Sequence, residues 1–285
     1  MAAVELKTGP TTVVVCGASN VSRGLARLAA VVGGRSSGPV ELFVTAGHGR
    51  SYGANSRVAA RRLPSILGSG LWRAIDRQDR GSAGRAGPVA LVTDVGNDLL
   101  YGFTVSQVAG WVRESVRRLT DTGAAIVITG LPLASIARVG PARYRALRAC
   151  YVPGCRLPLG DLKASATDLD ACLTGLAAER GIAMIRQPGE WYGFDAIHIR
   201  RRRLDELWHA TCDAWGLAGT PAVRRATWRD WAQLGSKAAE VRSLARRMRY
   251  TRERTPPPSL LRCVLARCRP DQRLFVSRRR ARLTA

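Results

Sequence analysis

The stretch "TTVVVCGASNVSRG", residues 11–24, decides the fold. Its first six residues are mostly β-branched and predict a buried strand. Gly17 ends this run, and the segment 21–34 that follows has helical spacing and stops at two glycines. Many enzymes place a nucleophile or a phosphate at such a strand-turn-helix junction. Ser19 is therefore a candidate nucleophile, a phosphate-loop residue or a simple helix cap.

The same alternation of strand-like and helix-like segments continues to residue 216. Further strands are predicted at 39–47, 87–96, 124–132 and 182–187, and further helices at 104–123, 164–181 and 199–216. Because the strands are continuously apolar, they indicate a parallel sheet that is covered by helices on both faces. We predict an α/β domain over residues 1–218, a flavodoxin-like three-layer α/β/α fold with a five-stranded parallel sheet.

The composition changes beyond this domain, over residues 219–285. Residues 221–285 contain 18 of the 45 Lys and Arg residues and 4 of the 21 Asp and Glu residues. The apolar spacing predicts a tryptophan-bearing helix over 228–248, and the arginine-rich end is expected to be partly disordered. Three hypotheses stay open for this extension: it packs on the first domain, it shields a site as a lid or dimer contact, or it binds an anionic membrane or nucleic acid.

Cysteine and histidine usage limits the chemistry. The chain has seven cysteines, an odd number, and only three histidines. It contains no CxxC pair, so a metal site is not expected. Without an export signal or an apolar run long enough to span a bilayer, we expect a cytoplasmic protein with reduced thiols.

Four polar signals fall where predicted strands end. They are Ser19, the loop "AGHGRSYG" at 46–53, Asn97 within "GND", and the pair Asp195 and His198. The carboxyl ends of parallel strands share one edge of a sheet, so these residues are expected to meet there.

Each of these four polar motifs suits a step in catalysis by a serine nucleophile. His198 has the properties of a base that takes a proton from a serine hydroxyl, and Asp195, three residues earlier, can fix its tautomer. An oxyanion needs aimed donors, and the backbone N–H of Ser19, a glycine N–H from the loop 46–53 and the Asn97 amide are candidates. The sequence thus favours a serine nucleophile that a histidine activates, with donors for the oxyanion of a tetrahedral intermediate.

This ordered set resembles the SGNH (GDSL-like) hydrolase family, over residues 11–216. By position, the resemblance implies that Ser19 is the nucleophile, His198 the base, Asp195 its partner and Asn97 an oxyanion-hole residue. It also implies an oxyanion-hole glycine in the second block, for which "GRS" favours Gly49 and leaves Gly47 as the alternative. The implied activity is that of a serine esterase that acts on an ester substrate without a cofactor.

Two positions depart from the family pattern. Ala18 stands where the first block usually has aspartate, which removes a carboxylate that would order the turn. Val95 stands where the third block usually has glycine. These departures keep an alternative open, namely a weak or inactive SGNH-fold binding protein that acts through residues 221–285 on nucleic acid or an anionic membrane.

Other motifs fit less well. The α/β-hydrolase elbow G-x-S-x-G fails because Val21 occupies its last glycine position. No dinucleotide fingerprint or Walker lysine follows the first strand, which disfavours the phosphate-loop hypothesis. Tyr52, Tyr101 and Trp191 lie beside the predicted catalytic loops and are candidate substrate-binding residues.

Overall fold

A five-stranded parallel sheet forms the centre of the protein. The computed structural model describes residues 10–58, 61–79, 87–219, 242–244 and 248–252, and every structural statement below refers to them. The strands are β1 (Thr11–Cys16), β2 (Val40–Thr45), β5 (Val89–Val92), β6 (Ala125–Thr129) and β7 (Ala183–Ile185). They run parallel in the order β7-β6-β5-β1-β2, which is the flavodoxin-like order, so the predicted fold class is confirmed.

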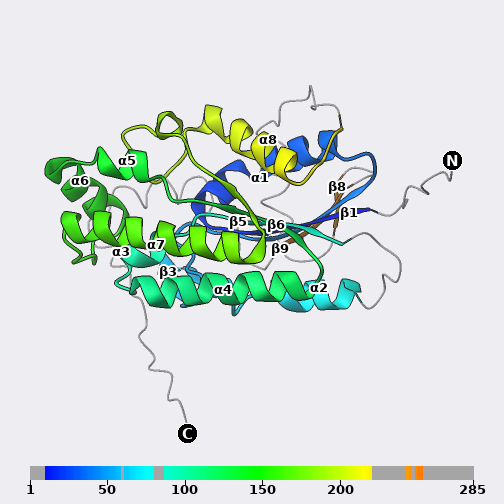
Figure 1. Cartoon of the computed structure of the whole chain (residues 1–285), viewed down its shortest axis with the longest axis horizontal. Coiled ribbons are helices and arrows are strands. Elements are labelled where there is room, and N and C mark those ends of the chain that lie inside the picture. Colours follow the sequence, from blue (N-terminus) through cyan, green and yellow to red (C-terminus); the bar gives the residue numbers. More distant parts are fainter. Residues whose placement is uncertain (1–9, 59–60, 80–86, 220–241, 245–247, 253–285) are drawn as a thin grey trace, which may run out of the picture.

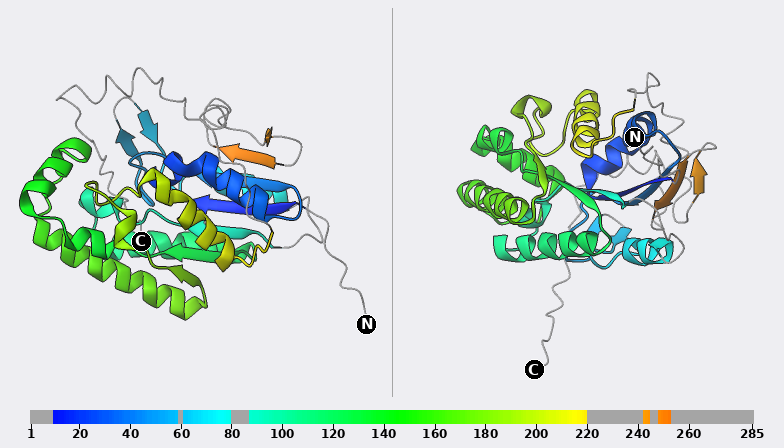
Figure 2. Two further views of the ribbon diagram at one scale, coloured as in Figure 1. Left: turned by 90° about the horizontal axis from the view of Figure 1, so that it is seen from above. Right: turned by 45° about the vertical axis from the view of Figure 1, so that its right-hand side comes forward.

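Helices cover both faces of this sheet. The helices α1 (Ser19–Arg35) and α8 (Leu204–Ala214) lie on one face, and α2 (Leu71–Asp79), α4 (Val105–Asp121) and α7 (Leu159–Arg180) lie on the other (Figure 1). Successive side chains of β1 serve the two layers in turn: Val13 and Val15 pack under α1 and α8, whereas Val14 and Cys16 pack on the opposite side. Figure 2 shows the same layering from two further directions.

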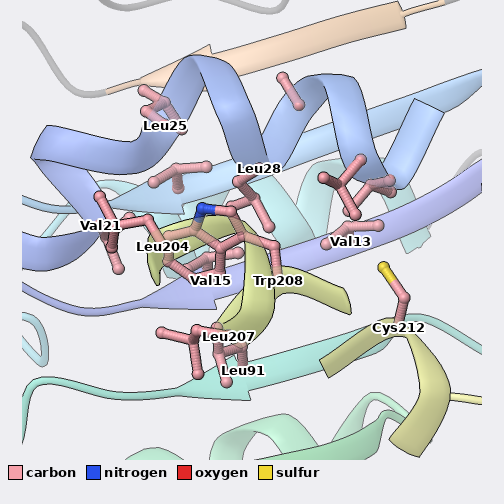
Figure 3. Packing of buried hydrophobic residues seen from close by; sticks show 14 of the residues in the cluster. Val13, Val15, Val21, Leu25, Leu28, Leu91, Leu204, Leu207, Trp208 and Cys212 are labelled. Carbon is pink, nitrogen blue, oxygen red and sulfur yellow. The ribbon is translucent and has the colours of Figure 1, made fainter. Parts of the chain in front are cut away.

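Trp208 of α8 fills the space between α1 and the sheet (Figure 3). The indole is completely buried and lies among apolar residues of both helices and of β1. A Cβ atom at Gly24 of α1 would lie 2.7 Å from the Trp208 ring, so a glycine lets the two helices approach this closely. The packing holds the start of α1, and with it Ser19, in a fixed position over the sheet.

Several short elements lie in the connections that the sequence reading left as loops. These are the antiparallel strands β3 (Ser56–Val58) and β4 (Arg61–Leu63), the helices α3 (Asn97–Leu100), α5 (Leu133–Ala137) and α6 (Pro141–Tyr151), and the 3₁₀ turn Gly189–Trp191. Within the helix predicted at 199–216, Arg201–Arg203 form a 3₁₀ turn and the α-helix begins at Leu204. Helix α7 also begins at Leu159, five positions before the predicted start at 164, directly after Pro158. The helices α5 and α6 lie at the end of the molecule away from the N-terminus (Figure 1).

The described part of the C-terminal extension is extended backbone. Strand β9 (Met248–Arg252) runs parallel beside β2, and β8 (Arg242–Leu244) pairs antiparallel with β9, so the sheet gains two edge strands. The predicted helix over 228–248 is therefore wrong at 242–244 and at Met248, because pairing with the free edge of β2 outweighs the local helical spacing. The rest of the extension, including its tryptophans, lies outside the described residues.

None of the helices in the described segments combines the length and apolar character that a membrane crossing requires. The five cysteines of the same segments are free, with Cys16, Cys155 and Cys212 buried and Cys150 and Cys172 exposed.

Candidate active site

Ser19 is the first residue of α1 and lies just beyond the carboxyl end of β1. It is 5% exposed, and Ala18 before it has an extended φ of −128° and no side-chain group to cap the helix. The amides of the first helical turn have no partner within the helix, so they need acceptors from elsewhere.

Asp94 supplies that acceptor from the loop that follows β5. Its Oδ2 accepts hydrogen bonds from the backbone N–H groups of Ala18 at 2.8 Å, Asn20 at 2.9 Å and Val21 at 3.3 Å. A carboxylate at a helix N-terminus is favourable because its charge faces the positive end of the helix dipole. The turn at Ser19 thus receives, from a distant loop, the carboxylate that Ala18 does not provide. A negative charge on these amides also disfavours a phosphate there.

Asp94 does not bind the backbone N–H of Ser19 itself. It binds the N–H groups before and after Ser19, but the structure gives the Ser19 N–H no acceptor within the described residues. Asp94 itself has a φ of +58°, a left-handed conformation that aspartate tolerates better than most residues. The arrangement keeps the Ser19 amide available to an incoming oxygen.

Asn20 joins this turn to the loop that carries His198. Its Nδ2 donates to Asp94 Oδ1 at 2.8 Å and to the carbonyl of Ile197 at 3.1 Å. Its Oδ1 accepts from the N–H of Ile199 at 2.9 Å. The side chain beside Ser19 therefore holds the backbone on both sides of His198, which fixes these two loops relative to each other.

Asp195 and His198 form the pair that their spacing predicts. Asp195 Oδ2 lies 2.5 Å from His198 Nδ1, and Asp195 Oδ1 accepts the backbone N–H groups of Ile197 at 3.1 Å and His198 at 3.2 Å. Burial alone would raise the pKa of Asp195, but hydrogen bonds from His198, Tyr151 and Ile197 outweigh it and lower the pKa below its usual value. Asp195 is thus held as a carboxylate that can orient the imidazole.

Tyr151, the last residue of α6, contacts both Asp195 and His198. Its ring lies edge-on to the His198 ring, with centroids 5.3 Å apart. Burial, together with a hydrogen bond to Asp195, raises the pKa of Tyr151 to about 12, so the phenol stays protonated and donates to the carboxylate. The sequence reading missed Tyr151 because no motif marks α6.

Asn97 begins α3, immediately after Gly96, whose φ is +119°. Its neighbour Asp98 is almost fully buried and accepts the N–H of Tyr52 at 3.0 Å. Burial raises the pKa of Asp98 to about 6, although hydrogen bonds from Ser51 and Tyr52 act in the opposite direction. Asp98 thereby fastens the loop 46–53 to the loop that carries Asn97.

The two glycines proposed for the oxyanion hole differ in their surroundings. The Gly47 N–H donates to the carbonyl of Ala18 at 3.3 Å, so it is already engaged. Gly49 adopts a φ of +71°, a left-handed conformation that glycine reaches without strain. Gly49 therefore stays the predicted donor, with the Gly47 N–H engaged by Ala18.

Of the three aromatic residues expected to bind substrate, Tyr52 and Trp191 are buried and Tyr101 is half-buried. The Tyr52 hydroxyl is buried and reaches the carbonyls of Cys16 at 3.1 Å and Thr93 at 2.7 Å, which ties β1 to β5. Trp191 is buried, and its indole donates to Glu206 at 2.8 Å. Burial raises the pKa of Tyr101, and its neighbours Leu99 and Leu100 line the adjacent cavity in its place. The structure thus gives Tyr52 and Trp191 internal partners in place of the substrate contacts expected from the sequence.

A cavity opens beside Ser19. The space between its walls, together with the part that opens to solvent, amounts to about 970 Å³. Ser19, Asn20, Asp94, Asn97 and Asp195 line its polar end. Its other walls are largely leucine and isoleucine from α3, α5, α6 and α7, together with valines of the adjoining loops. The cavity therefore joins the candidate reacting groups to an apolar chamber.

No family model matches the chain, and no curated protein sequence matches it. Solved structures with a similar course of the chain include a putative arylesterase from Agrobacterium tumefaciens, with 12% identity and a TM-score of 0.46 over 73% of this chain and 99% of that one. A carbohydrate acetylesterase family member from Sinorhizobium meliloti has 14% identity and a TM-score of 0.43 over 72% and 99%. A psychrotrophic esterase from Pseudoalteromonas sp., inhibited by monoethylphosphonate, has 12% identity and a TM-score of 0.42 over 72% and 98%. These structural neighbours are esterases.

Proposed function

We propose that the protein is a serine esterase of the SGNH type. Ser19 attacks the carbonyl carbon of an ester, and His198 takes the hydroxyl proton and passes it to the leaving alcohol. Asp195 orients His198 and stabilises the imidazolium that forms. Water, activated by the same imidazole, then attacks the acyl-serine ester, releases the acid and returns the proton to Ser19.

The oxyanion of each tetrahedral intermediate needs fixed donors. The Ser19 N–H, which Asp94 leaves unbound, the Gly49 N–H and the Asn97 amide are proposed to supply them. These donors are positioned before the substrate arrives, because Asp94 holds the amides on either side of Ser19 and Asp98 anchors the loop 46–53.

One observation carries the proposal: the Asn20 side chain joins the turn at Ser19 to the backbone on both sides of His198. A helix cap alone would not require this connection, since Asp94 already satisfies the helix amides. The connection supports the proposal, because it bonds the residue after Ser19 to the residues on either side of His198, 177 and 179 positions farther along the chain.

Labelling with a fluorophosphonate probe tests the proposal, because the probe traps an activated serine hydroxyl. We expect the wild type to be labelled and Ser19→Ala not to be. Ser22→Ala is a matched control, since Ser22 lies on the next turn of the same helix, where its hydroxyl donates to the carbonyl of Ala18 at 3.0 Å. A folded wild-type protein that is neither labelled nor able to cleave short-chain p-nitrophenyl esters would contradict the proposal.

A further inference from the structure

The walls of the cavity beside Ser19 are polar at one end and apolar at the other. Near Ser19 the lining is polar, whereas farther away it consists of apolar side chains from four different helices. These include Leu99, Leu131, Ile136, Leu147, Leu159 and Leu162. Their elements are α3, the loop after β6, α5, α6 and the start of α7, so the chamber is built by segments far apart in the chain.

Such walls discriminate between substrates. They offer few hydrogen bonds to a hydroxyl-rich or charged group, which would lose its water without compensation. Arg148 is the basic residue among the lining groups, and its guanidinium lies over the ring of Tyr144, 5.8 Å from the centroid. An alkyl chain, in contrast, gains with every methylene group that it buries.

The position of His198 indicates which half of an ester enters the chamber. The leaving oxygen must face His198 to receive its proton. Among the described residues, Tyr151 lines the cavity and lies edge-on to the His198 ring, whereas His198 itself is not part of the lining. Ser19 and Asn97, which would hold the acyl carbon and its oxygen, do line the cavity. The acyl chain then points into the chamber and the alcohol points away.

We infer that this cavity binds the acyl chain of the substrate and that the substrates are esters of fatty acids with an alkyl chain longer than that of acetate. This inference rests on the proposed esterase function and adds the substrate class. Burial of one methylene, worth roughly 0.8 kcal/mol, corresponds to about a fourfold gain in kcat/KM. Acyl length should therefore change the rate far more than the length of the alcohol.

Two ester series separate the acyl side from the alcohol side. With p-nitrophenol as the constant leaving group, kcat/KM is expected to rise roughly threefold to fourfold per methylene from acetate to octanoate, below micellar concentrations. With a constant acetyl group, lengthening the alcohol from methyl to octyl should change kcat/KM less than threefold. A flat acyl series, or a rise in the alcohol series instead, would overturn the inference.

Filling the chamber tests its location. Leu147→Trp should lower the ratio of kcat/KM for the octanoate ester to kcat/KM for the acetate ester at least tenfold. Ala146→Trp is the matched control, because Ala146 is the exposed neighbour on the same helix and should leave both unchanged. Leu159→Trp, on α7, repeats the test if Leu147→Trp does not fold. Equal losses for both esters, or none, would overturn the inference.

Binding to an inactive variant gives a readout that does not depend on turnover. Ser19→Ala should bind sodium decanoate at least tenfold more tightly than sodium butyrate in calorimetry, and Leu147→Trp should remove the difference. Cleavage of acetate esters that depends on Ser19, without preference for long acyl chains or decanoate binding, would leave the esterase function standing and overturn this inference alone. Loss of both labelling and ester cleavage would overturn the esterase function first.

Discussion

Replacing Asp94 with asparagine removes one charge from beneath the turn at Ser19 and changes little else. Asparagine is nearly the same size and, like aspartate, accepts the left-handed backbone that Asp94 has at φ +58°. Alanine would add backbone strain to the lost hydrogen bonds, so Asp94→Asn is the more informative variant.

The size of the effect follows from the four hydrogen bonds that Asp94 accepts. Three come from backbone N–H groups and one from the Asn20 amide. A bond to a charged acceptor contributes about 1 kcal/mol more than a neutral one, and an asparagine NH₂ cannot accept the bond that one carboxylate oxygen now accepts. Because Asp94 is partly exposed, we expect the free energy of unfolding to fall by about 2–4 kcal/mol.

Catalysis should suffer separately from stability. The same carboxylate holds Asn20, which in turn holds the loop of His198, so its loss should loosen the geometry between Ser19 and His198. We expect kcat to fall by about 10- to 100-fold at a temperature where the variant is fully folded, with a smaller change in KM. Urea unfolding followed by circular dichroism and p-nitrophenyl ester kinetics measure the two effects.

Asp161→Asn is the matched control, because Asp161 is also an acidic residue in a first helical turn, that of α7, but is exposed. It should change the free energy of unfolding by less than about 0.5 kcal/mol. If Asp94→Asn behaves like this control in both stability and kcat, then the carboxylate does not order the turn and the reasoning is refuted.

Three further substitutions probe other contacts. The pKa of Asp98 is about 6 in the folded protein, above its ordinary 3.8, so the wild type should lose stability as pH rises from about 4 to 6. Urea unfolding should show that Asp98→Asn gains up to roughly 3 kcal/mol of unfolding free energy relative to the wild type by pH 7. A difference between the two proteins that does not change with pH would contradict this. Tyr151→Phe removes a hydrogen-bond donor that lowers the pKa of Asp195. It should reduce kcat about fivefold, which corresponds to the free energy of one hydrogen bond. Unchanged ester kinetics would show that Tyr151 does not position Asp195. Gly24→Ala should lower the free energy of unfolding by about 1–2 kcal/mol, because the added methyl group overpacks the contact with Trp208. Gly175→Ala, which adds a methyl group in open space on α7, should raise it by up to about 1 kcal/mol. Urea unfolding that changes stability in the same direction for both variants would contradict this.

The features that the sequence predicts correctly are local ones. Residues 11–16 and the helix behind them are visible in their own spacing, and the order of the parallel strands follows from repeated alternation. Asp195 and His198 are three positions apart, so their pairing needs only one turn of chain. These predictions depend on neighbours in the sequence, which a single chain displays directly.

The features that the sequence reading missed depend on long-range contacts. Asp94 lies 76 positions from Ala18, and Asn20 lies 179 positions from Ile199, so neither partner is visible from local spacing. Helix α6 was missed because its sequence, "PARYRALRACY", has no capping side chain and spreads arginines among its apolar residues, so its helical periodicity is weak. Strand β8 and Met248, the first residue of β9, were predicted as helix because their conformation comes from pairing with an edge that local spacing does not reveal.

The bonds from Asp94 to the turn at Ser19 also bear on how relatives of this chain should be recognised. A search pattern that requires an acid directly before the nucleophile passes over a chain in which the acid reaches the same amides from another loop. Positions 18 and 94 should then vary as a pair in evolution: chains with alanine at the first are expected to retain an acid at the second, and chains with aspartate at the first are free to lose it. What we expect such a lineage to retain is a carboxylate next to the amides around Ser19, supplied either by position 18 or by position 94.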